Sequence, residues 1–299
     1  MAGQLVLCAT PIGNLGDISA RVLEALRGAD LIAAEDTRNS RKLMTHFDIH
    51  TPMISYHENN RFDRGRELTE TMREGVTVAL ITDAGTPAIS DPGEELVRMA
   101  CEAGITVTSL PGPAACITAL TLSALPAARF SMQGFLPRRK KDRDALLADI
   151  RDHAETQIFY EAPHRLRETI LSLAEILGAE RRIAVCRELT KVHEEVLRMT
   201  LGEAASYVSG EQDPGEAPPR AEEGAARSLQ NPRGEYVLVV EGRDHEAMRA
   251  QERAAWEEMS VEEHVARYIG QGMTEKGAMK QAARDRGCGK REIYAALKG

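Results

Sequence analysis

Residues 76–88 read VTVALITDAGTPA, and this stretch indicates the fold class. Val76–Thr82 is a near-continuous run of β-branched and aliphatic residues, the pattern of a central parallel strand that is covered on both faces. The run leads directly into Asp83–Ala88, a loop that contains a carboxylate, a glycine and a proline. Because ligands bind at the carboxyl ends of strands in open parallel sheets, we expect a ligand at this loop.

Strands and helices alternate on both sides of this stretch. Leu5–Ala9 and Leu31–Ala34 are short apolar runs typical of buried strands, and Thr106–Leu110 is a further one. Glu94–Ala103 has helical spacing and is followed by Gly104, a residue type that commonly ends a helix. This alternation predicts an α/β fold with a largely parallel sheet.

A second block of predicted elements begins near Ala114. It contains the predicted strands Gln157–Tyr160, Ile183–Arg187 and Tyr236–Glu241, and a predicted helix at Arg165–Leu177. Between the last two strands lies a stretch rich in proline and glycine, residues 209–234, which predicts a mobile surface loop.

The end of the chain differs from both blocks. Ser260–Glu263 has the pattern of a helix capping box, and Thr274–Gly299 carries 7 Lys/Arg against 3 Asp/Glu. A small apolar face at helical spacing is formed by Ala278, Met279, Ala282 and Ala283. We therefore predict three parts: an N-terminal α/β domain over 1–113, a C-terminal α/β domain over 114–245, and a basic helical tail over 246–299.

Composition excludes several classes of protein. The formal net charge of -8 argues against a protein that coats nucleic acid over its whole surface, although a local basic patch remains compatible with it. The 5 cysteines are scattered and form no C-x-x-C, which fits neither a disulfide framework nor a zinc site. No segment offers the ~20 apolar residues that a membrane span needs. We expect a soluble cytoplasmic protein.

Four polar loops follow predicted strands, at Thr10–Asn14, Glu35–Arg38, Asp83–Ala88 and Pro111–Ala114. Their glycines let the backbone approach a ligand closely. The motifs of other ligand sites are missing: no G-x-G-x-x-G follows a strand, no G-x-x-x-x-G-K-[ST] occurs, and no H-E-x-x-H is present. We therefore expect neither a dinucleotide site, nor a P-loop, nor a metal site.

Taken in order, these motifs resemble those of a known family. The motifs of this chain are similar, in order, to those of bacterial 16S rRNA (cytidine-2′-O)-methyltransferases, which belong to the tetrapyrrole-methylase superfamily. The matching blocks are Thr10–Ile18, Ala34–Arg38, Ser55–Glu58, Asp83–Gly93, Leu110–Pro113, Gly134–Arg138, Tyr160–Arg165, Arg187–Lys191 and Gly234–Val237. The resemblance covers roughly Leu5–Gly242, and the tail resembles the C-terminal extension of the family. Agreement over successive blocks is far more specific than any one of them.

The resemblance implies two α/β domains of the tetrapyrrole-methylase type with S-adenosylmethionine in the cleft between them, plus a small C-terminal helical extension. It also implies a homodimer and no metal. The cofactor-binding residues that it implies are Pro11, Asp83, Ala84, Gly85, Ala88, Ser90, Pro111, Gly112, Ala114, Phe135, Leu136 and Leu238.

The implied reaction is methyl transfer to the ribose 2′-hydroxyl of a cytidine in the decoding region of 16S rRNA, either as free RNA or within the assembled small ribosomal subunit. A ribose hydroxyl must lose its proton during attack, so we consider Glu35, Asp36 and Asp83 as the base or orienting acceptor. The alternative for each is a capping or pocket-shaping acid. Candidate phosphate-binding residues are Arg38, Arg138, Arg139, Lys140, Lys141, Lys191, Lys280, Arg284, Lys290 and Arg291.

Two other functions stay open at this point. A methylase that acts on a tetrapyrrole, a precorrin-like compound or another small metabolite would share the cofactor loops, although the basic run Arg138–Lys141 favours RNA. A non-catalytic nucleic-acid-binding protein, whose tail acts like a helix-turn-helix, is the alternative from another class. For Arg138–Lys141 itself, the alternative is a solvated charge run.

Overall fold

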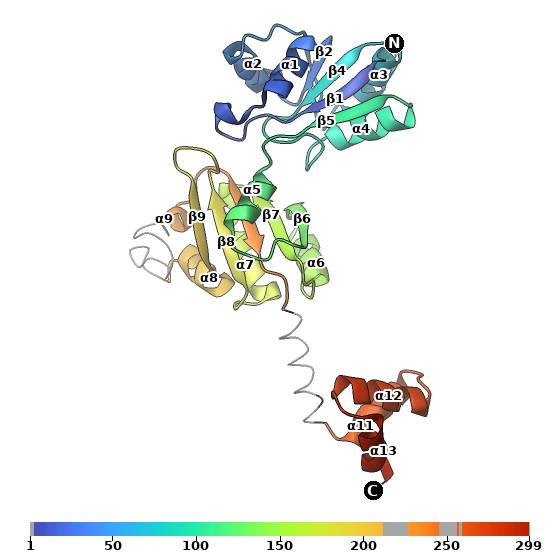
Figure 1. Ribbon diagram of the computed structural model, residues 1–299. Helices are drawn as coiled ribbons and strands as arrows, with labels where there is room; N and C mark the ends of the chain where they lie inside the picture. The colour runs from blue at the N-terminus through green and yellow to red at the C-terminus, as the bar shows by residue number, and fades with distance from the viewer. Residues whose placement is uncertain (1–2, 212–226, 245–255, 257–258, 299) are drawn as a thin grey trace. The chain divides into compact units, whose positions relative to one another are not determined.

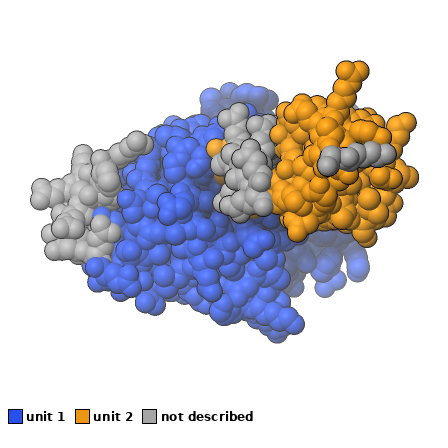
Figure 2. Space-filling model, turned by 90° about the horizontal axis from the view of Figure 1, so that it is seen from below, with its two compact units in different colours: residues 1–241 blue, residues 242–299 orange. Residues whose placement is uncertain are grey.

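The computed structural model describes residues 3–211, 227–244, 256 and 259–298. The chain divides into two compact units, Met1–Glu241 and Gly242–Gly299, which Figure 2 shows in different colours. The first unit contains two five-stranded sheets, and the described part of the second is helical (Figure 1). The expected α/β class is confirmed, and the domain boundaries at 113 and 245 stay predictions.

The first sheet is entirely parallel, as the sequence predicts. Its strand order is β3-β2-β4-β1-β5. The strands are β1 (Gln4–Cys8), β2 (Leu31–Ala34), β3 (Met53–Ser55), β4 (Thr77–Ile81) and β5 (Thr106–Leu110). Strand β4, which lies within the stretch 76–88, is at the centre of this sheet and has four of its five residues buried.

Helices cover both faces of the first sheet (Figure 1). They are α1 (Ala20–Gly28), α2 (Thr37–His46), α3 (Arg61–Arg73) and α4 (Gly93–Glu102), with a short 3-10 turn η1 (Leu15–Asp17) before α1. Alternate residues of β1 face opposite sides: Val6 packs with α1 and α2, whereas Leu5 packs with α3 and α4. This two-sided burial explains the uninterrupted apolar runs in the strands.

The second sheet is mixed, and its strand order is β6-β7-β10-β8-β9. Strands β6 and β7 pair in parallel, and the other three pairs are antiparallel. The strands are β6 (Phe130–Phe135), β7 (Thr156–Glu161), β8 (Arg182–Arg187), β9 (Glu195–Thr200) and β10 (Tyr236–Val240). The sequence predicted β7, β8 and β10 but neither β6 nor β9, and a largely parallel arrangement does not extend to this sheet.

Helix α5 (Ala115–Leu122) covers one face of the second sheet, where it packs against Val237 and Val239. The opposite face, which includes Leu238, packs against the remaining helices of the unit. These are α6 (Lys140–Ile150), α7 (Leu166–Leu177) after the turn η2 (Pro163–Arg165), α8 (Leu201–Ser209) and the short α9 (Arg227–Gln230). Of the loop predicted over 209–234, residues 212–226 lie outside the described residues.

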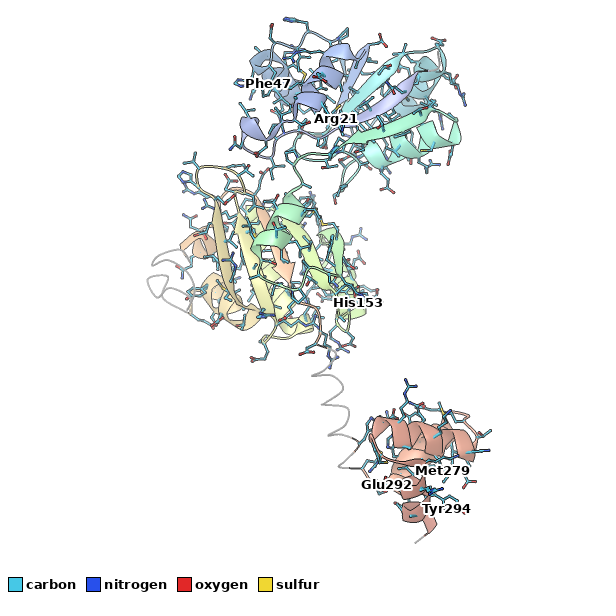
Figure 3. The ribbon with its side chains drawn as sticks, viewed as in Figure 1. Arg21, Phe47, His153, Met279, Glu292 and Tyr294 are labelled. Atoms are coloured by element: carbon cyan, nitrogen blue, oxygen red, sulfur yellow. The ribbon has the colours of Figure 1, made fainter. Side chains whose placement is uncertain are left out.

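The second unit contains α11 (Val261–Gly270), α12 (Glu275–Asp285) and α13 (Lys290–Lys298). The predicted capping box is present, with Ser260 and Glu263 bonding reciprocally at the start of α11. The predicted apolar face of α12 is buried, and its Met279 packs in the same cluster as Ile293 of α13. Figure 3 labels Met279 on α12 and Tyr294 on α13. In the ranges that the structure describes, no helix is long and apolar enough to cross a membrane.

Candidate functional site

The loops that follow the parallel strands are tied to one another. The Thr10 N–H donates to the Gly85 carbonyl (2.9 Å), and the Gly85 N–H donates to the Thr10 carbonyl (3.1 Å). The Thr86 hydroxyl donates to the Pro113 carbonyl at 2.9 Å. Loops that are distant in sequence therefore form one rigid edge, as expected for the carboxyl ends of a parallel sheet.

A cavity of about 430 Å³ lies at this edge, and residues from both sheets of the first unit line it. Its volume is within the usual range for small-molecule sites. Of the residues predicted to form the site, those that line it are Glu35, Asp83, Ala84, Gly85, Ser90, Ala114 and Phe135. The sequence therefore predicts the main loops that line the cavity.

Other predicted residues are not among those that line the cavity: Pro11, Asp36, Ala88, Pro111, Gly112, Leu136 and Leu238. For Leu238 the reason is the alternation of a strand. Its side chain is buried among α6, α7 and α8, while its neighbour Val237 faces the cavity. Leu136 is buried in the same cluster as Leu238.

A second group of lining residues is not among the individual site residues predicted from the sequence. It includes Ile12, Asp91, Cys116, Leu189, Tyr160–Pro163 and Glu235–Val237. Of those named, all but Cys116 lie in a predicted ligand loop or a family motif. Tyr160–Pro163 comes at the end of β7, so the rule that ligands bind where strands end could have found it. Glu235 precedes β10 and lies at the cavity only because β10 runs antiparallel to β7, which the sequence does not reveal.

Glu35 and Asp83 are the predicted catalytic acids that reach the cavity. One oxygen of Glu35, Oε2, accepts from the Thr82 hydroxyl at 2.9 Å. The other oxygen has no hydrogen-bond partner in the part of the chain that the structure describes. Asp83 is exposed, and its Oδ1 accepts from the Asp36 N–H at 3.2 Å. Glu35 is therefore held in place with one oxygen available.

Asp36 has a different environment. Its carboxylate caps α2 by accepting from the Arg38 N–H at 2.8 Å, and it also pairs with the Arg38 guanidinium at 3.0 Å. The hydrogen bond from the Arg38 side chain, followed by that from its backbone N–H, lowers the pKa of Asp36 to about 2. A carboxylate that is already paired in this way is a weak proton acceptor.

The loop from Asp83 to Gly93 holds a strained backbone beside the cavity. Ala88 and Ser90 have φ values of 67° and 62°, a region that costs non-glycine residues about 1–3 kcal/mol each. Asp91 Oδ1 stabilises the loop by accepting from the N–H groups of Ala88 (3.0 Å) and Gly93 (2.7 Å). Burial raises the pKa of Asp91, whose Oδ2 is buried without a hydrogen-bond partner among the described residues.

The cavity is acidic. Five carboxylates line it, and no Lys, Arg or His is among its lining residues in the described chain. Two of the five are in ion pairs, Glu161 with Arg165 at 3.5 Å and Glu235 with Lys191 at 2.7 Å. The other three, Glu35, Asp83 and Asp91, have no ion-pair partner among the described residues. The cavity therefore suits a ligand that carries positive charge.

The predicted phosphate-binding residues of the first unit fall into two groups. Arg138, Arg139 and Lys141 are exposed and have no ion pair within the described ranges. The others are paired with carboxylates: Arg38 with Asp36, Lys140 with Asp144, and Lys191 with both Glu188 and Glu235. Burial opposes the charge of Lys191, but its two carboxylate partners outweigh this effect and raise its pKa.

One basic surface was not predicted. Arg38, Arg41, Lys42 and His46 occupy one side of α2 and, with Thr45, line an open depression of about 430 Å³. Helical spacing brings them together, although neutral residues separate Arg38 from Arg41 and Lys42 from His46 in the sequence. In the second unit, the predicted residues Lys280, Arg284, Lys290 and Arg291 are all exposed. No group of side chains that could hold a metal ion occurs within the described ranges.

Known proteins resemble this chain in sequence. Residues 4–205 match the family described as Tetrapyrrole (Corrin/Porphyrin) Methylases. The chain is 46% identical over 292 residues to Ribosomal RNA small subunit methyltransferase I of Halalkalibacterium halodurans, which covers 98% of this chain and 93% of that protein. It is 44% identical over 294 residues to the protein of the same name from Bacillus subtilis, covering 98% and 94%.

Among solved structures, the chain is similar to uroporphyrin-III C-methyl transferase from Thermus thermophilus complexed with S-adenyl homocysteine. The TM-score is 0.52 at 14% identity, and the match covers 80% of this chain and 97% of that one. At this sequence identity, the similarity concerns the fold alone.

Proposed function

The chain belongs to the tetrapyrrole (corrin/porphyrin) methylase family, and from this premise we propose that it transfers a methyl group from S-adenosylmethionine to small-subunit ribosomal RNA. The acceptor is the ribose 2′-hydroxyl of a cytidine in the decoding region, of the cytidine 1402 type. The observation that carries the proposal is an acidic cavity, together with basic residues outside it that have no carboxylate partner in the described part of the chain. A cationic cofactor fits inside, and the phosphates of an RNA substrate fit outside.

The residues of the cavity fit S-adenosylmethionine. Its sulfonium and ammonium groups are positive, and Glu35, Asp83 and Asp91 are carboxylates without an ion-pair partner among the described residues. The apolar lining, with Ile12 and Val237, suits the adenosyl group. When bound, the cofactor supplies an already activated methyl group, so the protein's task is to bind, align and deprotonate.

We expect Gly85→Val to weaken S-adenosylmethionine binding by about tenfold or more, since strain of about 1–3 kcal/mol would displace the loop. Gly85 has a φ of +89°, which a β-branched residue rarely adopts. The space itself permits a Cβ, which would lie 3.4 Å from Ile12. Backbone conformation therefore causes the expected effect, and calorimetry with S-adenosylmethionine measures it.

Gly104→Val is the matched control. Gly104 has a φ of +71°, and a Cβ there would meet no atom within 4 Å. It follows α4 and is not among the residues that line the cavity, so the same kind of strain should lower thermal stability without changing cofactor affinity. Unchanged affinity in folded Gly85→Val would remove this loop from the site.

Within this function, Glu35 takes the proton of the ribose hydroxyl. The Thr82 hydroxyl holds one of its oxygens, so the other can face the acceptor. Asp83 lies beside it and orients the end of β2 by accepting from the Asp36 N–H. Asp36 shapes the site by capping α2 instead of acting as a base, since Arg38 already engages its carboxylate.

The RNA is held by basic residues that have no carboxylate partner among the residues that the structure describes. These are Arg138, Arg139 and Lys141 near the cavity, Arg41 and Lys42 on α2, and the four exposed residues of the tail, Lys280, Arg284, Lys290 and Arg291. Contacts of this kind bind phosphates independently of sequence. The family resemblance also supports a homodimer that acts in the cytoplasm, where small subunits are assembled.

A tetrapyrrole methylase is the second candidate, because the same fold serves that chemistry in the Thermus enzyme. The two are separated by incubating the protein with methyl-labelled S-adenosylmethionine and one of three acceptors: small ribosomal subunits that lack the modification, free 16S rRNA, or uroporphyrinogen III. We expect label in the RNA of at least one ribosomal sample. Label in the tetrapyrrole alone, or in no acceptor despite cofactor binding, would overturn the proposal.

A further inference from the structure

Phe135 is an aromatic side chain that lies at the cavity and is exposed to solvent. It is 55% exposed, yet it lines the cavity together with Tyr160. Isolated exposed apolar residues are common on protein surfaces, so exposure alone indicates nothing. The backbone around Phe135, however, is built to place its ring at this point.

A β-bulge places Phe135 opposite Tyr160. Along the β6–β7 pair, Met132 lies opposite Ile158, but the regular register then shifts by one residue. Without the shift, Gly134 would lie opposite Tyr160; with it, Phe135 takes this position. Bulges of this kind are frequent beside active sites, where they redirect a side chain.

Gly134 makes the bulge possible. Its φ of +67° is a conformation that glycine adopts without strain. A Cβ on Gly134 would lie 3.2 Å from the Ser90 hydroxyl, so the bulge also contacts the strained loop of the first sheet. Immediately after Phe135, the Leu136 carbonyl is held by the Arg165 guanidinium at 2.7 Å. The position of the Phe135 backbone is thus fixed on both sides.

Tyr160 supports the ring of Phe135 from within the cavity. The two ring centroids are 5.7 Å apart, with planes inclined by 58°. Burial raises the pKa of the Tyr160 hydroxyl, so this ring stays neutral. The exposed face of Phe135 has no ring partner among the described residues, so it can accept a further flat, apolar group.

The charges nearby decide which flat group this is. Arg138 follows Phe135 by three residues, so their Cα atoms are at most about 11 Å apart. Arg138, Arg139 and Lys141 are exposed and unpaired among the described residues, and they suit phosphates. S-adenosylmethionine carries no phosphate, whereas each nucleotide of an RNA joins a base to one.

We propose that Phe135 is the stacking platform for the base of the target nucleotide, while the ribose enters the acidic cavity. The inference rests on the proposed function, because it assigns one part of the same site to RNA. A nucleotide whose ribose enters a cavity loses the stacking of its neighbours in the RNA. An aromatic ring at the rim replaces that stacking, and it can stack on any of the bases.

Phe135→Ala tests the platform. We expect kcat/KM for small subunits lacking the modification to fall about 10- to 100-fold, the range of stacking on a single base. The Kd of S-adenosylmethionine should stay within about twofold, because the ring serves the RNA. Phe135→Tyr keeps a ring and should recover most of the loss.

Phe130→Ala is the matched control, because Phe130 is 41% exposed on the same strand but does not line the cavity. Its kcat/KM should equal that of the wild type. Wild-type kcat/KM in Phe135→Ala would reject the platform, and a tenfold rise in the Kd of S-adenosylmethionine would assign Phe135 to the cofactor. The wild-type reaction tests the proposed function separately. If the wild-type protein transfers no methyl group to the subunits, the proposed function itself is rejected.

Discussion

In Glu35→Gln, the rate of methyl transfer at saturating S-adenosylmethionine falls by about 10²- to 10⁴-fold, the usual contribution of a general base. The amide has nearly the same shape as the carboxylate and can still accept from the Thr82 hydroxyl, but it cannot take a proton. The loss should fall mainly on turnover, because proton removal occurs only in the transition state. Cofactor affinity should weaken far less, since Asp83 and Asp91 keep their negative charges at the cavity. Single-turnover kinetics with small ribosomal subunits and calorimetry with S-adenosylmethionine measure the two quantities.

Asp36→Asn provides the control on the neighbouring acid. Asn is as good a helix cap as Asp, so the start of α2 should be preserved. Because Asp36 is paired with Arg38 and is not among the lining residues, turnover should stay within about threefold of the wild type. A large loss of turnover in Asp36→Asn together with near-normal turnover in Glu35→Gln would mean that Asp36, and not Glu35, takes the proton.

Replacing Lys280, Arg284, Lys290 and Arg291 together by Gln should weaken RNA binding by on the order of 10³-fold at ~0.1 M salt, if each of the four contacts a phosphate. The slope of log K against log salt is negative, and each lost contact reduces its magnitude by about 0.7–0.9, so the slope should become less steep by about 3. All four side chains are exposed, and the apolar core of the second unit does not include them, so the helices should remain folded.

The matched control removes four positive charges that are already paired. Gln at Arg64, Arg66, Arg73 and Arg98 changes the net charge equally, but each of these residues pairs with a carboxylate on its own helix. RNA affinity should change little in this variant, and S-adenosylmethionine affinity should be unchanged in both. Wild-type affinity and salt slope in the tail variant would mean that the second unit holds no RNA phosphates.

The sequence predicts the first sheet well because each of its strands carries its own signal. Strand β4 is buried on both faces, so its residues 77–81 are continuously apolar after Thr77. The loops after β1, β2, β4 and β5 are recognisable by the same logic, since a parallel sheet brings the ends of its strands to one edge. For this reason the sequence alone assigns Glu35, Asp83 and Gly85 to one site, and all three line the cavity.

The second sheet contributes to the site in ways that a local pattern does not contain. The antiparallel pairing of β10 with β7 brings Tyr236 opposite Glu161, and both line the cavity. The position of Phe135 depends on a bulge at Gly134, where the alternation of apolar and polar residues over Phe130–Gln133 ends, but this local pattern does not reveal which strand pairs with β6. Register and strand direction are set by tertiary packing, so the local pattern does not show that Tyr236 and Phe135 lie at the cavity. Glu161, at the end of β7, follows the general rule for strand ends.

Charge was also only partly predictable. Lys191 stands in a basic-looking motif, but folding places it between Glu188 and Glu235, which satisfy its charge. Arg41 and Lys42 received no role from the sequence, although α2 brings them beside Arg38 in one depression. A count of basic residues identifies candidates, whereas their carboxylate partners decide which remain free for RNA.

The position of the transferred methyl group tests the central claim most directly. Small ribosomal subunits that lack the modification are incubated with the protein and S-adenosylmethionine, and their RNA is digested and mapped by mass spectrometry. The account predicts one added methyl group, on the ribose 2′-oxygen of a cytidine in the decoding region. A methyl group on a base, a methylated ribose outside the decoding region, or RNA of unchanged mass would contradict it.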